Sequence, residues 1–94
     1  MRTYELMTIF RPDMAETDVR AEVSRIETAL AERGADVQGT DFWGKRRFAY
    51  EIQHLSEGYY AVVTFAAAAN AVTDVDRALS LSDNVLRHKF IRPE

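Results

Sequence analysis

Apolar and polar residues alternate along four stretches of this sequence, as they do in β-strands that bury one face. The alternation predicts strands at residues 3–10, 40–52, 59–65 and 85–92. Pro12 follows the first strand and Pro93 the last, where a residue without an N–H ends the pairing. Trp43 and Gly44 are typical of a bend or β-bulge inside the second strand. The polar residues 53–58 then predict the turn of a hairpin between the second and third strands.

A helical period separates the first strand from the second. It predicts a helix over residues 16–33 that buries Val19, Val23, Ile26 and Leu30, at positions i, i+4, i+7 and i+11. Asp13 and Glu16 have the spacing of a capping box, and Thr17 or Asp18 would serve as N-cap if the helix began later. Gly34 is placed to end the helix.

A second, shorter helix is predicted between the third strand and the fourth. Residues 66–69 form a small-residue connection, and Asn70 is suited to be the N-cap. The apolar positions of this helix are Val72, Val75 and Leu79, and the pattern breaks at residues 80–84.

The element order βαββαβ predicts an α+β fold, a ferredoxin-like split β-α-β sandwich in one domain that spans residues 1–94. Right-handed crossovers place strands one and three in the centre of a four-stranded antiparallel sheet, with strands two and four at its edges. Both helices should cover one face, because each has only one apolar stripe to bury. The side chains predicted to face the helices are Tyr4, Leu6, Phe10, Phe48, Tyr50, Ile52, Ala61, Val63, Phe65, Leu86 and Phe90. Those predicted on the open face are Glu5, Met7, Arg47, Glu51, Tyr60, Val62, Thr64, Arg87, Lys89 and Ile91.

The composition is that of an ordinary globular protein, with 47% hydrophobic and 29% charged residues in 94. The start of the chain lacks the pattern of a signal peptide, so we expect a cytoplasmic protein. The net charge of -3 argues against a protein that holds nucleic acid by bulk charge. The acids concentrate in the segments 13–36 and 70–81, which hold nine acids and four bases. The strands and their ends are therefore slightly basic, which allows one locally cationic face.

Lys45, Arg46 and Arg47 form a cationic run at the point where the second strand resumes its alternation. No acid lies between Gly44 and Tyr50, so these charges must face water or an anionic partner. A solvated edge that blocks aggregation and a binding site both fit this pattern.

The sequence offers little to catalysis. It has no cysteine, and its two histidines, His54 and His88, lie at no spacing from an acid or hydroxyl that would imply a triad or a metal site. The four glycines are isolated, so no phosphate-cradling loop is predicted. The segment 57–62 only partly matches the base-stacking strand of RNA-recognition domains, which share this topology. Tyr60 is therefore a candidate either for stacking on RNA or for packing against a protein partner.

Four segments together resemble the bacterial small-subunit ribosomal protein six family. They are RTYE at residues 2–5, GKRRFAYEI at 44–52, GYY at 58–60 and DNVLR at 83–87. The resemblance implies the split β-α-β fold, no enzymatic activity and no cofactor. It also implies a place in the small ribosomal subunit and a heterodimer with small-subunit ribosomal protein eighteen that binds the central domain of the small-subunit rRNA. Phe48 departs from the aliphatic residue common in the family, and the sequence ends at Pro93-Glu94 without the polar tail of many members.

The resemblance and the charge pattern together identify the candidate site residues. The RNA-binding candidates are Arg2, Arg46, Arg47, Arg87, Lys89 and Arg92. The partner-binding candidates are Ala49 and Tyr60, at or near edge strand two. The partners expected are thus rRNA and ribosomal protein eighteen, with no membrane and no small-molecule substrate. The alternative function is a ferredoxin-like regulatory module that dimerises through its open sheet and binds a small metabolite.

Overall fold

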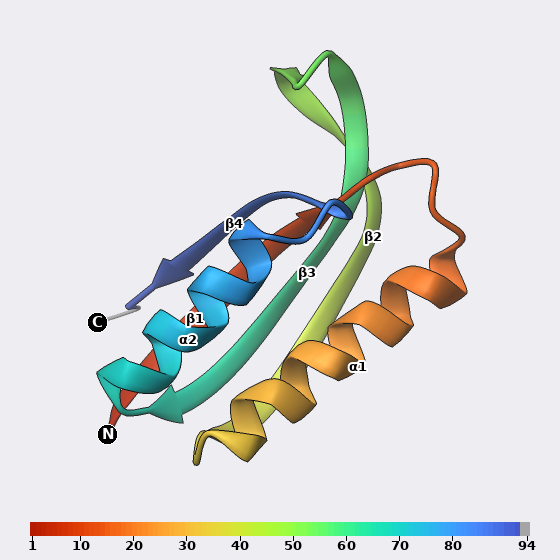
Figure 1. Ribbon diagram of the computed structural model, residues 1–94. Coiled ribbons are helices and arrows are strands. Elements are labelled where there is room, and N and C mark those ends of the chain that lie inside the picture. Colours follow the sequence, from red (N-terminus) through yellow and green to blue (C-terminus); the bar gives the residue numbers. More distant parts are fainter. Residues whose placement is uncertain (93–94) are drawn as a thin grey trace.

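Four antiparallel strands form one sheet, and two helices lie across the same face of it (Figure 1). The computed structural model describes residues 1–92, so Pro93, expected to follow the last strand, lies outside the described residues. The elements are β1 (Arg2–Phe10), α1 (Glu16–Glu32), β2 (Asp36–Ile52), β3 (Leu55–Ala67), α2 (Ala69–Ser80) and β4 (Val85–Ile91). The strand order is β2-β3-β1-β4. The predicted fold class and the central position of the first and third strands are therefore confirmed.

The core lies between the helices and the sheet, where the apolar stripes of the helices pack against the apolar face of the strands. All four predicted apolar positions of α1, from Val19 to Leu30, are buried. On α2 the buried residues are Ala71, Val75 and Leu79, so Ala71 takes the place predicted for the half-buried Val72. The sheet contributes alternate residues of its central strands, including the fully buried Leu6, Val63 and Phe65. Each large apolar side chain buried in this layer stabilises the fold by about 1.5–3 kcal/mol.

The helix starts differ from the predictions. Their N-caps are Ala15 and Ala68, neither with a side-chain hydrogen bond to the helix, so Asp13 and Asn70 do not cap. The Asp13 carboxylate instead lies 3.5 Å from the guanidinium of Arg11. The end of α1 follows its prediction: Gly34 has φ +83° and its N–H donates to the carbonyl of Ala31, as expected of a glycine after a helix.

The hairpin between β2 and β3 has longer strands and a shorter turn than predicted. Its turn consists of Gln53 and His54, whose φ angles of 51° and 65° are those of a two-residue hairpin turn, and β3 begins at Leu55. The predicted six-residue turn is therefore wrong, as is the predicted start of the second strand, which lies at Asp36. The end of the hairpin projects past both helices (Figure 1), although the side-chain amide of Gln53 donates to the carbonyl of Leu86 on β4.

β2 contains the bulge predicted at Trp43 and Gly44, and the bulge reverses the faces beyond it. Phe42 pairs with Ala61 and Gly44 with Tyr60, which leaves Trp43 as an extra residue, and Gly44 has φ +83°. One extra residue moves the regularly paired side chains that follow it, Lys45 to Arg47, to the opposite face. The predictions that Phe48 and Tyr50 face the helices are therefore wrong: Phe48 lies against Tyr60, and Tyr50 is 77% exposed.

Candidate nucleic-acid interface

The face of the sheet opposite the helices, here called the uncovered face, presents Arg87 and Lys89 side by side. Arg87 pairs with Ile9, and Lys89 pairs with Met7, so both cations leave β4 on this face as predicted. Both side chains are exposed. Within residues 1–92 neither forms an ion pair with an acid. Their charges are therefore available to an anionic ligand.

Trp43, Phe48 and Tyr60 form a group on the same face that we call the aromatic cluster. The rings of Trp43 and Tyr60 stack with centroids 5.8 Å apart and an interplanar angle of 12°. The ring of Phe48 meets Tyr60 edge-on at 6.0 Å. Trp43 remains 41% exposed, and its indole N–H donates to the carboxylate of Asp41. The cluster therefore offers an apolar surface on β2 and β3, with β1 between it and the two cations of β4.

Gly58 allows the aromatic cluster to pack closely on β1. A Cβ atom at Gly58 would lie 2.7 Å from the carbonyl oxygen of Phe10 and 2.9 Å from both Cγ2 of Ile9 and Cζ of Phe48. Such distances are too short for real Cβ contacts, so the ring of Phe48 occupies space that only glycine leaves free.

The cationic run at the start of the hairpin divides between two faces. The guanidinium of Arg46 lies 5.3 Å from the ring centre of Trp43, at the aromatic cluster. Lys45 pairs with Tyr59 and its ammonium lies 5.1 Å from that ring, on the helix side. Arg47 pairs with Glu57 and shares this side, because paired residues of neighbouring strands point the same way. The prediction that Arg47 lies on the open face is wrong, and the reason is the bulge at Trp43.

Arg2 and Arg92, two further RNA candidates, lie together at the other end of the sheet. They line a shallow hollow of about 470 Å³ with Tyr4 and the residues where α2 begins. The first turn of α2 carries no acidic residue. Two arginines therefore line this hollow, which is separate from the uncovered face.

Ala49, a candidate for partner binding, is exposed in an irregular part of β2. Arg47 pairs with Glu57, and Ile52 pairs with Leu55. Between these two pairs, several residues of β2 lie opposite a single residue of β3, Ser56. The stretch 48–51 therefore lacks a regular partner on β3.

The sequence predictions missed Trp43 as a contact of Tyr60. The bulge predicted at this position carries the signal, because an extra residue changes the faces of the side chains that follow it. No group of three or more potential metal ligands occurs in the described part of the chain. His88 lies between β4 and α2, where its Nε2 is 2.7 Å from the carboxylate of Asp76. Among residues 1–92 no helix is long and apolar enough to cross a membrane.

Comparison with known proteins gives a consistent family. The family model described as ribosomal protein S6 matches residues 3–92. A small ribosomal subunit protein bS6 from Acidothermus cellulolyticus is 44% identical over 94 residues, which cover 100% of this chain and 98% of that protein. The protein of the same name from Paenarthrobacter aurescens is 43% identical, with coverage of 100% and 93%.

Solved structures agree with this family. The crystal structure of 30S ribosomal protein S6 from Thermotoga maritima superposes with a TM-score of 0.92 at 27% identity, over 97% of this chain and 86% of that chain. The C-terminal domain of the MgtC protein from Mycobacterium tuberculosis has a TM-score of 0.62 at 18% identity, over 100% and 89%, which shows a shared fold alone. The alternative prediction of a metabolite-binding regulatory module gains no support from a likeness of fold.

The family model spans nearly the whole chain, and relatives above 40% identity match it over its full length. The chain therefore belongs to the ribosomal protein S6 family: it is a structural protein of the small ribosomal subunit, in the cytoplasm, and not an enzyme.

Proposed function

We propose that this chain binds the central domain of the small-subunit rRNA as a heterodimer with small-subunit ribosomal protein eighteen. The observation that carries the proposal is the exposed pair of Arg87 and Lys89 on the uncovered face of an otherwise acidic protein. Residues two apart in a strand place their side chains about 6–7 Å from each other, near the spacing of adjacent phosphates on one strand. The pair is thus matched to a phosphate backbone in charge and in spacing.

Backbone contact fits the geometry better than stacking of bases on Tyr60. Trp43 lies parallel to the Tyr60 ring, and Phe48 packs on it edge-on. An RNA base would have to displace one of these rings to stack there. Contacts to phosphates position a protein on RNA without reading its bases, which suits a structural role.

The aromatic cluster and the neighbouring edge of β2 are the proposed seat of the partner protein. Trp43 and Tyr50 are among the exposed large hydrophobic residues, and Ala49 lies in the stretch of β2 without regular pairing. A partner segment can bury such rings and hydrogen-bond to the free edge of the strand. Tyr60 contributes to this seat as the ring on which Trp43 and Phe48 pack.

The remaining RNA candidates are proposed as outer phosphate contacts. Arg46 lies beside the uncovered face at Trp43, whereas Arg47 lies on the other side of the hairpin. Arg2 and Arg92 lie at the far end of the sheet. An RNA that reaches all of them must pass around the edges of the sheet.

The RNA proposal is tested by the double variant Arg87→Gln/Lys89→Gln. The control is Arg33→Gln/Arg77→Gln, which removes the same charge from the helix side and, with it, the ion pair between Arg33 and Asp74. We expect the log-log salt slope for binding of an rRNA fragment, with the partner present, to become shallower by about one to two units in the test variant only. Parental affinity and parental slope in the test variant would assign both residues to ordinary solvated surface.

The partner seat is tested by Ala49→Asp, with Ala21→Asp on the exposed surface of α1 as the control. The new charge on β2 would have to lose its water when the partner docks, so it should weaken the heterodimer more than it weakens the fold. Isothermal calorimetry with purified partner measures this difference. Equal partner affinity for parent and Ala49→Asp would move the seat away from this edge.

A further inference from the structure

The register of β4 decides whether Arg87 and Lys89 reach the uncovered face. Phe10 pairs with Val85, but Ile9 pairs with Arg87, so Leu86 is an extra residue on β4. If pairing continued without this bulge, Arg87 would lie opposite the buried Thr8, and Lys89 would lie opposite Leu6. Both cations would then point at the helices.

The hydrophobic pattern of β4 specifies this register weakly. Apolar residues occur at odd positions, Val85 and Ile91, and at even positions, Leu86 and Phe90, so apolar side chains lie on both faces of the strand with or without the bulge. β4 is also a short edge strand that pairs with β1 alone. Strands with mixed faces tend to slip, so other contacts must fix the start of β4.

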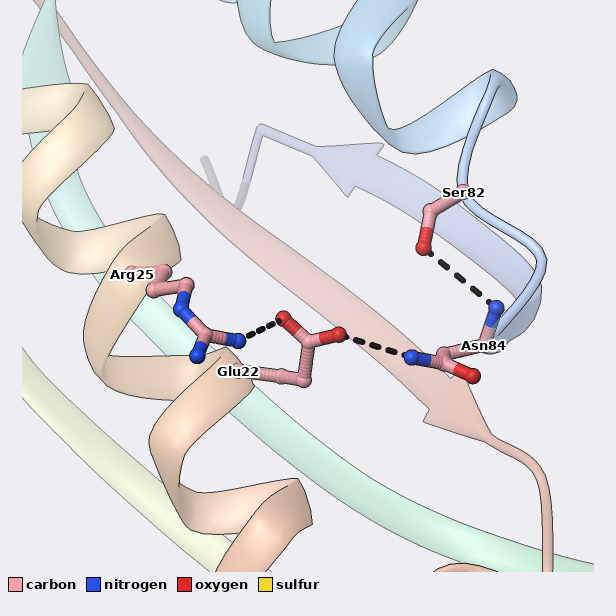
Figure 2. Close-up of polar contacts among 4 residues, drawn as sticks. All are labelled: Glu22, Arg25, Ser82 and Asn84. Atoms are coloured by element: carbon pink, nitrogen blue, oxygen red, sulfur yellow. Dashed lines mark hydrogen bonds and ion pairs between the residues drawn. The ribbon is translucent and has the colours of Figure 1, made fainter.

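Asn84 makes these contacts directly before β4. Figure 2 shows its side-chain amide directed at Glu22 of α1, with a donor-acceptor distance of 2.9 Å to Oε1. Its backbone N–H donates to the hydroxyl of Ser82 at 3.4 Å. Its carbonyl accepts from the N–H of Arg11, at 3.0 Å, just beyond the end of β1. One residue thus ties the start of β4 to α1 and to β1.

Glu22 is itself held in place. Its other carboxylate oxygen accepts from the guanidinium of Arg25 at 2.9 Å (Figure 2). The hydrogen bond from Asn84, followed by that from Arg25, keeps the pKa of Glu22 below its ordinary value. The ionised carboxylate therefore faces a neutral amide donor, which an aspartate at position 84 would replace by a second negative charge.

We propose that Asn84, anchored by Glu22, is a positioning residue that pins the start of β4, so that the bulge at Leu86 forms and Arg87 and Lys89 leave the sheet on its uncovered face. This inference rests on the proposed function, since it concerns the placement of the proposed phosphate contacts. His88 is a second anchor further along β4, through its contact with Asp76. Loss of Asn84 should therefore displace the beginning of β4 first, at Arg87.

The test exchanges the donor and the acceptor of the hydrogen bond between Asn84 and Glu22. Asn84→Asp sets two carboxylates against each other, whereas Asn84→Asp/Glu22→Gln restores a donor and an acceptor with the net charge of the parent. Asn84→Ala, which removes the donor without adding charge, serves if Asn84→Asp does not fold. Thr28→Ala, on the exposed surface of α1, is the control.

Two measurements are made on each variant in the full chain. The first is the set of cross-strand NMR contacts between the backbones of Ile9 and Arg87, which needs no RNA. The second is the salt slope of binding to the rRNA fragment with the partner present. We expect Asn84→Asp or Asn84→Ala to weaken the Ile9–Arg87 contacts and to flatten the slope by roughly one unit. The reversed pair should restore both.

The outcomes separate this inference from the proposed function. Unchanged Ile9–Arg87 contacts in both single variants would overturn the positioning role, whatever the RNA data show. Weakened contacts without restoration by the reversed pair would overturn the role of Glu22 as anchor. If the contacts respond as expected while Arg87→Gln/Lys89→Gln leaves RNA binding unchanged, the positioning of β4 stands and the RNA proposal fails.

Discussion

Replacing Gly58 by alanine introduces a methyl group where the fold has no room for one. The new Cβ would lie within 3 Å of three atoms from three residues, namely Phe10, Ile9 and Phe48. The Phe48 ring can rotate away, at the expense of its contact with Tyr60. The carbonyl of Phe10 cannot, because it belongs to β1, which pairs with a strand on each side.

The expected loss of stability follows from the clash with the carbonyl of Phe10, which cannot move aside as the ring of Phe48 can. Insertion of a methyl or methylene group into a well-packed site costs about 1–3 kcal/mol, and a clash with fixed backbone belongs at the upper end of that range. We therefore expect Gly58→Ala to lower the free energy of unfolding by about 2–3 kcal/mol. For a domain of this size the melting temperature should fall by roughly 10–20 °C. The protein should still fold, since domains are typically stable by about 5–15 kcal/mol.

Chemical denaturation followed by circular dichroism measures the loss in stability. The fluorescence of Trp43, the only tryptophan, reports separately on the aromatic cluster. Gly39→Ala is the matched control, because a Cβ at Gly39 meets nothing within 4 Å and its φ is not positive. We expect that control to stay within about 0.5 kcal/mol of the parent. Equal stability of the two variants would refute the reasoning, since it would mean that β1 and Phe48 move aside at no cost.

Two further predictions concern the helices. Leu30→Ala should destabilise by about 2–5 kcal/mol, because Leu30 is fully buried and its truncation leaves a cavity; a loss below about 0.5 kcal/mol in a urea titration would contradict this packing. The pKa of Glu22 is lower in the folded protein than its ordinary value of 4.5. The ionised carboxylate therefore stabilises the fold at pH values above 4.5, and this contribution is lost as the pH falls through the lowered pKa. The stability difference between the parent and Glu22→Gln should therefore shrink in acid, and urea midpoints that keep a constant difference at every pH would contradict it.

The elements and their order could be predicted because the sequence shows the helical and the strand periodicity of apolar residues clearly. Val19, Val23, Ile26 and Leu30 predict α1 on spacing alone, and all four are buried. The helix starts could not be predicted in the same way. Polar residues suited to capping stand near both starts, but the chain places alanines at both N-cap positions. A cap is decided by local backbone geometry, and spacing does not encode it.

The candidate site was harder to predict because single extra residues decide which way its side chains point. Alternation from Phe48 backward predicts Arg47 on the open face, but the extra residue Trp43 moves it to the helix side. On β4 alternation predicts the faces of Arg87 and Lys89 correctly, although Leu86 is an extra residue, because the bulge precedes both of them. A pattern of alternation is reliable between bulges and fails across them.

The irregularities of β2 have a consequence for solubility. A free edge strand of 17 residues would offer a long row of unpaired N–H and C=O groups, on which a second copy of the chain can add its own strand. The register shifts near Gln38, Trp43 and residues 48–51 interrupt that row, so that no flat segment of the edge matches another copy over its full length. Straightening β2, for example by deleting Trp43, would join two of these segments into a longer template for fibrils. We therefore expect the bulges that divide the cations between two faces also to lower self-association along this edge.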